Sequence, residues 1–319
     1  MGDEAVEWNG VNIDSLMKTL KLLLCVGLLV AGVTACGFKA VHSPKQKTAF
    51  LPLFDVHFHY NEPIDENKLL SSLSTAHITR AVLFGTENAS EMARKYPERF
   101  VASYSGSLSL NRRALKGGKD EAIAQKIASE FEQALQSGFY RGLGEVSTYH
   151  HAYPDDPIAP DSPLMLRLLE VAGRYRVPIN VHCSDFGYSE MERALRASPS
   201  TTVIWAHTGS HLAPDKIEAL LREFPNLYFD LAAMDERWPG NHTLLSFLER
   251  IDESWRRLFE EFPERFLVGF DLSTDVDRSR QISQAAEDAA VMQRVLSGLT
   301  SATATKLAYE NAERLYQVR

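Results

Sequence analysis

Two histidines stand two residues apart in an otherwise apolar run, LFDVHFHY at 53–60. Side chains alternate along a β-strand, so His57 and His59 point to the same side if this run is extended. Imidazoles buried in a strand are costly unless a hydrogen bond or a metal ion satisfies their nitrogen atoms. The pair is therefore a candidate metal site, and two ordinary polar residues at a strand end are the alternative.

Other ionisable residues follow later apolar runs in the chain, namely Glu145, His182, His207, Asp230 and Asp271. A single histidine in a strand is more often a hydrogen-bonded core residue than a ligand. The recurrence of imidazoles and carboxylates at corresponding places favours one shared site, because a divalent cation would satisfy all of them at once. Mixed nitrogen and oxygen donors favour zinc, with manganese or iron as alternatives, over calcium and magnesium. We therefore expect one or two divalent metal ions as cofactors.

The elements that must position these residues are short apolar runs that alternate with amphipathic stretches of helical spacing. This alternation predicts a parallel sheet built from strand–helix–strand units. The expected strands are 50–60, 80–85, 100–107, 139–148, 177–184, 201–207, 226–233 and 266–273, and the clearest helices are 120–138, 163–176 and 214–225. Eight strands over about 270 residues predict a single-domain α/β fold, a (β/α)8 TIM barrel, whose strand ends meet at one mouth. An open doubly wound sheet is the alternative, but its glycine-rich turn after an early strand is missing.

The composition fits a packed globular protein, with 45% hydrophobic and 24% charged residues. The formal net charge of −8 disfavours sequence-independent binding of nucleic acid, whose phosphates an acidic surface repels. Of three cysteines, Cys183 stands alone in the body of the chain, so no disulfide framework is expected. Cys183 should point away from the neighbouring His182, as a buried structural thiol.

Five of the strand ends together resemble the amidohydrolase superfamily. The motifs are DVHFH on the first strand, a candidate metal ligand on the fourth, VH on the fifth, AH on the sixth and FD on the eighth. The segments KYPERFVASYS and ENAERLYQV look like the amidohydrolase-related (amidohydrolase 2) branch of TIM-barrel metal-dependent hydrolases. The resemblance covers about 50–319 and implies hydrolysis by a metal-activated water.

The resemblance also implies a role for each candidate ligand. A more buried ion would be bound by His57, His59 and Asp271, and a second ion by His182 and His207, with Glu145 as the bridge. Asp271 would accept the proton of the attacking water and pass it to the leaving group. Some decarboxylases of the family lack the carboxylate on the fourth strand, so Glu145 favours hydrolysis at a two-metal site. A glutamate paired with an arginine or a helix is the alternative for Glu145.

Residues for substrate binding are expected in the loop STYHHAYPDDP, which follows the strand that carries Glu145. Tyr149, His150 and His151 could line the pocket, and a surface loop with a chance pair of histidines is the alternative. Asp230 ends the seventh strand and is expected in the pocket, with capping of the next helix as its alternative.

The leading hypothesis is a metal-dependent hydrolase acting on a small ester, lactone or amide. A phosphodiesterase or nuclease similar to TatD is the second, because GLGEVSTYH resembles that group. It is weaker, since the chain is acidic and FDLST lacks an acidic ending of the eighth strand. The third is a non-catalytic periplasmic metal-binding lipoprotein, which the complete set of candidate ligands disfavours.

The segment MKTLKLLLCVGLLVAGVTAC, 17–36, has the order of parts of a secretory signal. Lys18 and Lys21 form a short positive region, and an apolar run over 22–33 follows it. This run of about a dozen residues is too short to span a bilayer, which needs about 20. The ending VTAC resembles a bacterial lipobox, which implies that Cys36 is lipidated and becomes the first mature residue.

The acidic stretch 1–16 lacks the character of a signal, so we expect translation to start at Met17 and cleavage to occur before Cys36. The expected organisation is an extension and signal peptide over 1–35, a tether over 36–49 and a hydrolase domain over 50–319. Gly37 replaces the aspartate that tends to retain lipoproteins in the inner membrane. The expected location is therefore the outer membrane, facing the periplasm, with a small molecule as substrate and the membrane as partner.

Overall fold

The computed structural model describes residues 50–318 except 86, 107–116, 152–156, 211, 235–243, 246–249 and 276–280. The described residues belong to one compact unit. The expected signal peptide, the start at Met17, the lipidation site Cys36 and the tether lie outside the described residues. Within the described part of the chain, no helix combines the length and the apolar character needed to cross a membrane.

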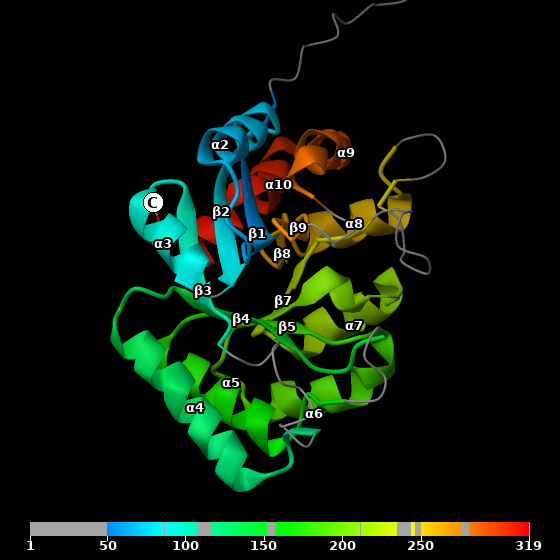
Figure 1. The fold of residues 1–319 in the computed structure, drawn as a ribbon. Helices are drawn as coiled ribbons and strands as arrows, with labels where there is room; N and C mark the ends of the chain where they lie inside the picture. The colour runs from blue at the N-terminus through cyan, green and yellow to red at the C-terminus, as the bar shows by residue number, and fades with distance from the viewer. Residues whose placement is uncertain are drawn as a thin grey trace, which may run out of the picture. The chain divides into compact units, whose positions relative to one another are not determined.

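The described strands form one parallel sheet in the order β8-β7-β6-β5-β4-β3-β2-β1-β9 (Figure 1). The strands are β1 (Leu53–His59), β2 (Ile78–Gly85), β3 (Phe100–Tyr104), β4 (Gly142–Ser147), β5 (Ile179–His182), β6 (Val203–Trp205), β7 (Leu227–Asp230), β8 (Phe266–Leu267) and β9 (Leu272–Ser273). β8 pairs with β7 and β9 pairs with β1, so the last segment of the sheet closes it into a ring. The predicted TIM barrel is confirmed.

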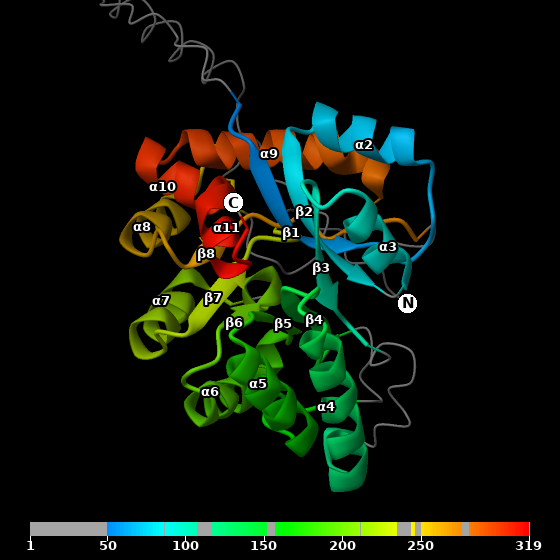
Figure 2. The ribbon, with the colours of Figure 1, turned by 90° about the vertical axis from the view of Figure 1, so that its left-hand side faces the viewer.

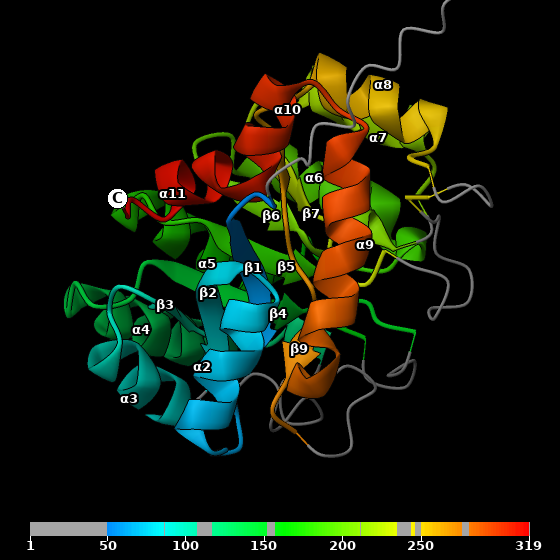
Figure 3. The same cartoon turned by 90° about the horizontal axis from the view of Figure 1, so that it is seen from above.

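Helices surround the strands on the outside, as the three views show (Figures 1, 2 and 3). They are α2 (Glu66–Thr75), α3 (Glu87–Lys95), α4 (Glu121–Gln136), α5 (Pro163–Tyr175), α6 (Tyr188–Ala197), α7 (Pro214–Glu223), α8 (Glu253–Glu261), α9 (Ala285–Ser297), α10 (Ser301–Thr305) and α11 (Asn311–Leu315). The first and last long helices, α2 and α9, lie side by side next to β1 (Figure 3).

Local sequence explains where the predicted helices begin and end. The Asp120 side chain accepts hydrogen bonds from the amides of Ala122 and Ile123 and so caps the start of α4. α5 starts with the Ser162 cap followed by proline and ends at Arg176, whose φ of 55° lies in the left-handed region. Buried apolar residues then recur at helical spacing and pack against the outer face of the strands.

Two apolar clusters lie on the two faces of the strands. The larger cluster joins the outward side chains of the strands to the helices. The smaller one contains Phe54, Val56 and Phe84 from the first two strands and Tyr316 just beyond α11. Both faces are therefore buried, which explains the near-continuous apolar runs of the sequence.

The segment 266–273, predicted as one strand, is divided in the structure into β8 and β9. A Cβ at Gly269 would lie 3.1 Å from His57 Cβ and 3.2 Å from Ala232 Cβ, so the chain passes close to the strand that carries His57. Asp271 has a φ of 56°, which a regular strand does not allow. Because the strand is interrupted, Asp271 at the mouth of the barrel does not have the backbone conformation of a regular strand.

Candidate metal centre

Three of the predicted ligands form one group at the carboxyl end of β1. The Nε2 atoms of His57 and His59 lie 3.2 Å apart. Asp271 Oδ1 lies 3.2 Å from His59 Nε2 and 3.6 Å from His57 Nε2. The residues predicted for the more buried ion therefore converge at one mouth of the barrel, as the metal hypothesis requires.

The second group forms around Glu145, which stands between the two sets of histidines. Its Oε1 atom lies 3.0 Å from His182 Nδ1, 3.3 Å from His207 Nε2 and 3.6 Å from His57 Nε2. Its Oε2 atom lies 3.5 Å from His59 Nε2. Glu145 is thus paired with histidines, and the alternative of an arginine partner does not apply to these contacts.

Backbone geometry sets the direction of several of these side chains. His207 lies in a short 3-10 turn after β6, with a φ of 55°, so its ring turns inward where a strand would have continued. Gly144 precedes Glu145 with a φ of 109°, and a Cβ there would overlap the carbonyl oxygen of Asn180. Only glycine lets β4 approach β5 this closely and place Glu145 against the rings.

Asp230 lies under the cluster, with no exposed surface. Its Oδ2 atom contacts His57 Nδ1 at 3.0 Å and accepts a hydrogen bond of 2.8 Å from Asn180 Nδ2. Its Oδ1 atom accepts from the amides of His207, at 2.9 Å, and Ala232, at 3.2 Å. This position differs from the expected substrate contact, because Asp230 instead orients His57 so that Nε2 faces the cluster.

Charges in the metal-free chain follow from this crowding. Burial alone would lower the pKa of His57, but Asp230, Glu145 and Asp271 raise it to about 10. Burial alone would raise the pKa of the Asp271 carboxyl, but the hydrogen bond from His59 and the charge of His57 hold it well below its usual range. The pKa of Glu145 is also held low against burial, by His57, His182 and His207.

The donor set fits divalent cations. Groups of three donor atoms lie within 4.8 Å of one another in His57–His59–Asp271 and in Glu145–His182–His207. Imidazole nitrogens and carboxylate oxygens are the ligands that zinc, manganese and iron prefer. Two carboxylates kept ionised against burial also supply the negative charge that cations require.

A family model described as amidohydrolase (Amidohydro_2) matches residues 48–318. The chain belongs to the amidohydrolase family. No curated protein matches the chain.

Solved structures of similar fold include proteins of different stated activities. A TatD homologue from Escherichia coli aligns with a TM-score of 0.59 at 14% identity, over 85% of this chain and 100% of its own. A dihydroxybenzoic acid decarboxylase from Polaromonas with bound manganese aligns at 0.54 and 15%, over 83% and 96%. A probable 2-pyrone-4,6-dicarboxylic acid hydrolase from Acinetobacter baumannii aligns at 0.55 and 13%, over 84% and 100%. Identities this low establish the shared fold alone.

The loop after β4 brings one of its predicted residues next to the candidate metal ligands of this amidohydrolase. The ring of His150 stacks on that of His182, with centroids 4.0 Å apart and planes 10° apart. Tyr149 instead stacks on Phe186, and His151 Nε2 lies 3.2 Å from Asp185 Oδ1 with half of the side chain exposed. Of the three, His150 is therefore the one whose ring contacts a candidate ligand.

Cys183 occupies the predicted structural position. The side chain is buried, and burial raises the pKa of the thiol to about 12. The Cys183 carbonyl oxygen accepts a hydrogen bond of 2.7 Å from Trp205 Nε1, which ties β5 to β6. A neutral, buried thiol is a packing group and no nucleophile.

Sequence reasoning missed two polar residues that support the cluster, Asp55 and Asn180. Asn180 lies two residues before His182 and donates to Asp230. Asp55 lies two residues before His57, and burial raises its pKa to about 8 against hydrogen bonds from the amides of His57 and Phe270. The signal in both cases was a polar residue inside an apolar strand, on the first and fifth runs of the sequence.

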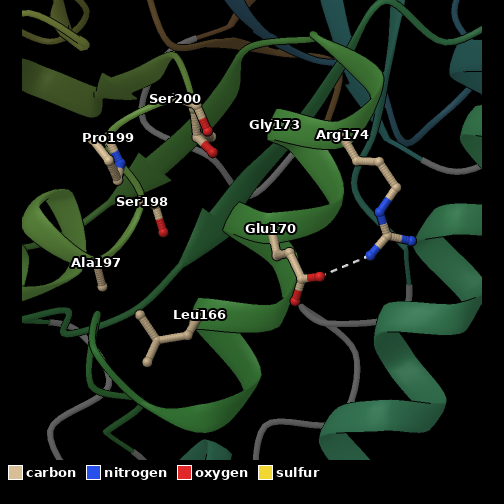
Figure 4. Close-up of a pocket in the computed structure, with 9 residues that line it drawn as sticks. Leu166, Glu170, Gly173, Arg174, Ala197, Ser198, Pro199 and Ser200 are labelled. Atoms are coloured by element: carbon tan, nitrogen blue, oxygen red, sulfur yellow. Dashed lines mark hydrogen bonds and ion pairs between the residues drawn. The ribbon is translucent and has the colours of Figure 1, made fainter.

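A separate hollow lies away from the candidate metal ligands, between α5 and the segment that follows α6 (Figure 4). Its wall includes Leu166, the Glu170–Arg174 ion pair of 2.9 Å and Ser198. α5 ends here and β6 begins here, so the hollow is at the amino ends of the strands, opposite the mouth that holds the candidate ligands. It contains none of those ligands.

Proposed function

We propose that this amidohydrolase is a metal-dependent hydrolase that acts on a small ester, lactone or amide. The observation that carries the proposal is the position of Glu145, whose Oε1 atom lies within 3.6 Å of nitrogen atoms of three histidines. A carboxylate that faces both groups of donors is suited to bridging two neighbouring cations. Glu145 favours hydrolysis over decarboxylation, because some decarboxylases of the family lack the carboxylate on the fourth strand.

The two groups of residues have distinct tasks in this proposal. One ion would be held by His57, His59 and Asp271, and a second by His182 and His207, with Glu145 shared between them. A bound divalent ion lowers the pKa of a coordinated water and polarises the oxygen of the group under attack.

Asp271 is suited to moving the proton. Its carboxylate is ionised at neutral pH, because neighbouring histidines hold its pKa low, and about 8% of the residue is exposed at the mouth. It accepts a proton from the attacking water and returns that proton to the leaving group. Asp230 keeps the Nε2 atom of His57 directed at the cluster throughout.

Metal analysis of the purified full chain tests the first half of the proposal. We expect bound zinc, manganese or iron, loss of activity on chelation, and recovery when one of these ions is returned. A chain that purifies without metal, binds none of the three ions on titration and keeps its activity in chelator would exclude a metal-dependent reaction.

A substrate panel tests the second half. The panel contains lactones, esters, amides, phosphodiesters and aromatic carboxylic acids, and we expect turnover within the first three classes. Turnover of phosphodiesters alone would support the TatD-like alternative, and release of carbon dioxide would support decarboxylation. Asp271→Asn should lower kcat far more than it raises KM. Asp252→Asn makes the same substitution outside the cluster, at the start of α8, and should leave kcat unchanged.

We also propose that Cys36 anchors the protein in the outer membrane, with the hydrolase domain in the periplasm. The support is the positive region, apolar run and VTAC ending at 17–36.

A further inference from the structure

The ring of strands closes along a seam between β1 and the segment 266–273. Backbone hydrogen bonds cross this seam at both ends: the Val56 amide donates to the Val268 carbonyl oxygen at 3.0 Å, and Phe58 pairs with Leu272. Between them, residues 268–271 belong to no strand. The interrupted stretch lies opposite His57 and ends at Asp271, two of the candidate ligands.

The Asp55 side chain bridges this interruption. Its Oδ1 atom accepts hydrogen bonds from the amides of His57, at 2.9 Å, and Phe270, at 3.1 Å. The first amide belongs to a candidate ligand, and the second belongs to the residue before another, Asp271. One carboxyl oxygen thus takes the place of a ladder carbonyl and fixes both sides of the seam to each other.

Two further features make this contact more than ordinary packing. Asp55 has no exposed surface, and its Oδ2 atom has no hydrogen-bond partner among the described residues. Burying a carboxyl group whose second oxygen has no hydrogen-bond partner is costly, so satisfying two amides in this way carries a penalty that ordinary packing does not. Asp271 also has a left-handed φ of 56°, a conformation that needs support from its surroundings.

We propose that Asp55 is a positioning residue that sets the spacing between the β1 histidines and Asp271, and thereby the affinity of the group His57–His59–Asp271 for a divalent ion. The inference rests on the proposed metal-dependent function. It adds a residue that contacts neither ion nor substrate and acts through two backbone amides.

The test measures metal affinity without any substrate. A His182→Ala background weakens the second group, so that titration of the apo-protein with Zn²⁺ against a chromophoric chelator reports on the group His57–His59–Asp271. In this background Asp55→Ala should weaken binding about 10- to 100-fold, the range seen when outer-shell partners of metal ligands are removed. Asp55→Asn keeps an acceptor oxygen for both amides and should stay within about threefold of the parent.

Asn311→Ala is the matched control for lost stability. Asn311 is buried, and its Nδ2 atom donates to the carbonyl oxygens of Pro263 and Phe266, at the other end of the same closing segment. This variant should lower the melting temperature and leave the zinc affinity unchanged.

The outcomes separate the two proposals. A parent chain that binds no zinc refutes the proposed function. If the parent binds zinc and Asp55→Ala binds it with the same affinity, the positioning role is refuted and the proposed function is not. Equal losses in Asp55→Ala and Asn311→Ala also refute it, because a general loss of stability would then explain both. If Asp55→Ala does not fold, a loss of affinity in Asp55→Asn as large as tenfold refutes the role of the acceptor oxygen.

Discussion

Asp230→Asn is the substitution whose consequences the structure defines most closely. All four groups that face the Asp230 carboxylate are donors: the His57 Nδ1–H, the Asn180 amide and the backbone amides of His207 and Ala232. A carboxylate accepts from both sides, whereas an amide offers one oxygen and one NH₂ group. After the substitution, two donors on one side must face an NH₂ group.

The expected loss of stability follows from that count. A buried donor left without an acceptor costs about 1–3 kcal/mol, so two of them lower the free energy of unfolding by about 2–6 kcal/mol. One relaxation is open to the variant. His57 can lose its Nδ1 proton, accept from the new NH₂ group and carry its proton on Nε2 instead.

That relaxation removes the nitrogen lone pair that would bind the ion. We therefore expect Asp230→Asn to bind Zn²⁺ about 10- to 100-fold more weakly than the parent chain. Denaturant unfolding measures the stability change, chelator competition measures the affinity, and ¹⁵N NMR of the imidazole shows which nitrogen carries the proton.

Asp252→Asn is the control with the same chemistry. Asp252 caps the start of α8 by accepting from the Ser254 amide, a task that asparagine also performs. Its stability and zinc affinity should match those of the parent. The reasoning is refuted if Asp230→Asn keeps the parent's zinc affinity and the imidazole of His57 keeps its proton on Nδ1.

Three more results are expected. The pKa of about 10 keeps His57 protonated at neutral pH in the metal-free chain. A protonated imidazole cannot bind an ion, so zinc affinity should rise about tenfold per pH unit from about pH 6 to about pH 9. A flat pH profile of the affinity in titration calorimetry would contradict this. In a denaturation assay, Gly144→Ala should lower the free energy of unfolding by about 2–4 kcal/mol, because its Cβ would overlap the Asn180 carbonyl oxygen at a φ of 109°. Gly138→Ala has open space around its Cβ and should cost about 1 kcal/mol in the same assay. Cys36→Ala should abolish incorporation of labelled palmitate and release the protein from the membrane fraction, and labelling that persists would exclude lipidation at Cys36.

The fold was predictable because its signals are local or periodic. Each predicted strand lies on or overlaps a strand of the barrel, and the helix predicted over 120–138 corresponds to α4 with its Asp120 cap. The alternation of strands with helices then implied the parallel sheet, since right-handed crossovers leave few other arrangements. The lipidation of Cys36 stays a prediction from the sequence.

The site was predictable only as a set of candidates. Alternation along β1 placed His57 and His59 on one side, and the barrel hypothesis placed Glu145 and Asp271 at the same mouth. Asp230 has the same sequence signal as these ligands, a carboxylate at a strand end. Sequence could not distinguish it from them, because that distinction depends on depth in the barrel.

The sequence by itself determined which residues are candidates for the chemistry and which strand holds each of them. Tertiary structure decided what each carboxylate does. It placed Glu145 between the histidines, Asp230 beneath His57 and Asp55 across the closing seam. The physical reason is that these roles depend on distances between strands far apart in the chain. Those distances are set by where the ring of strands closes and by the left-handed turn at Asp271.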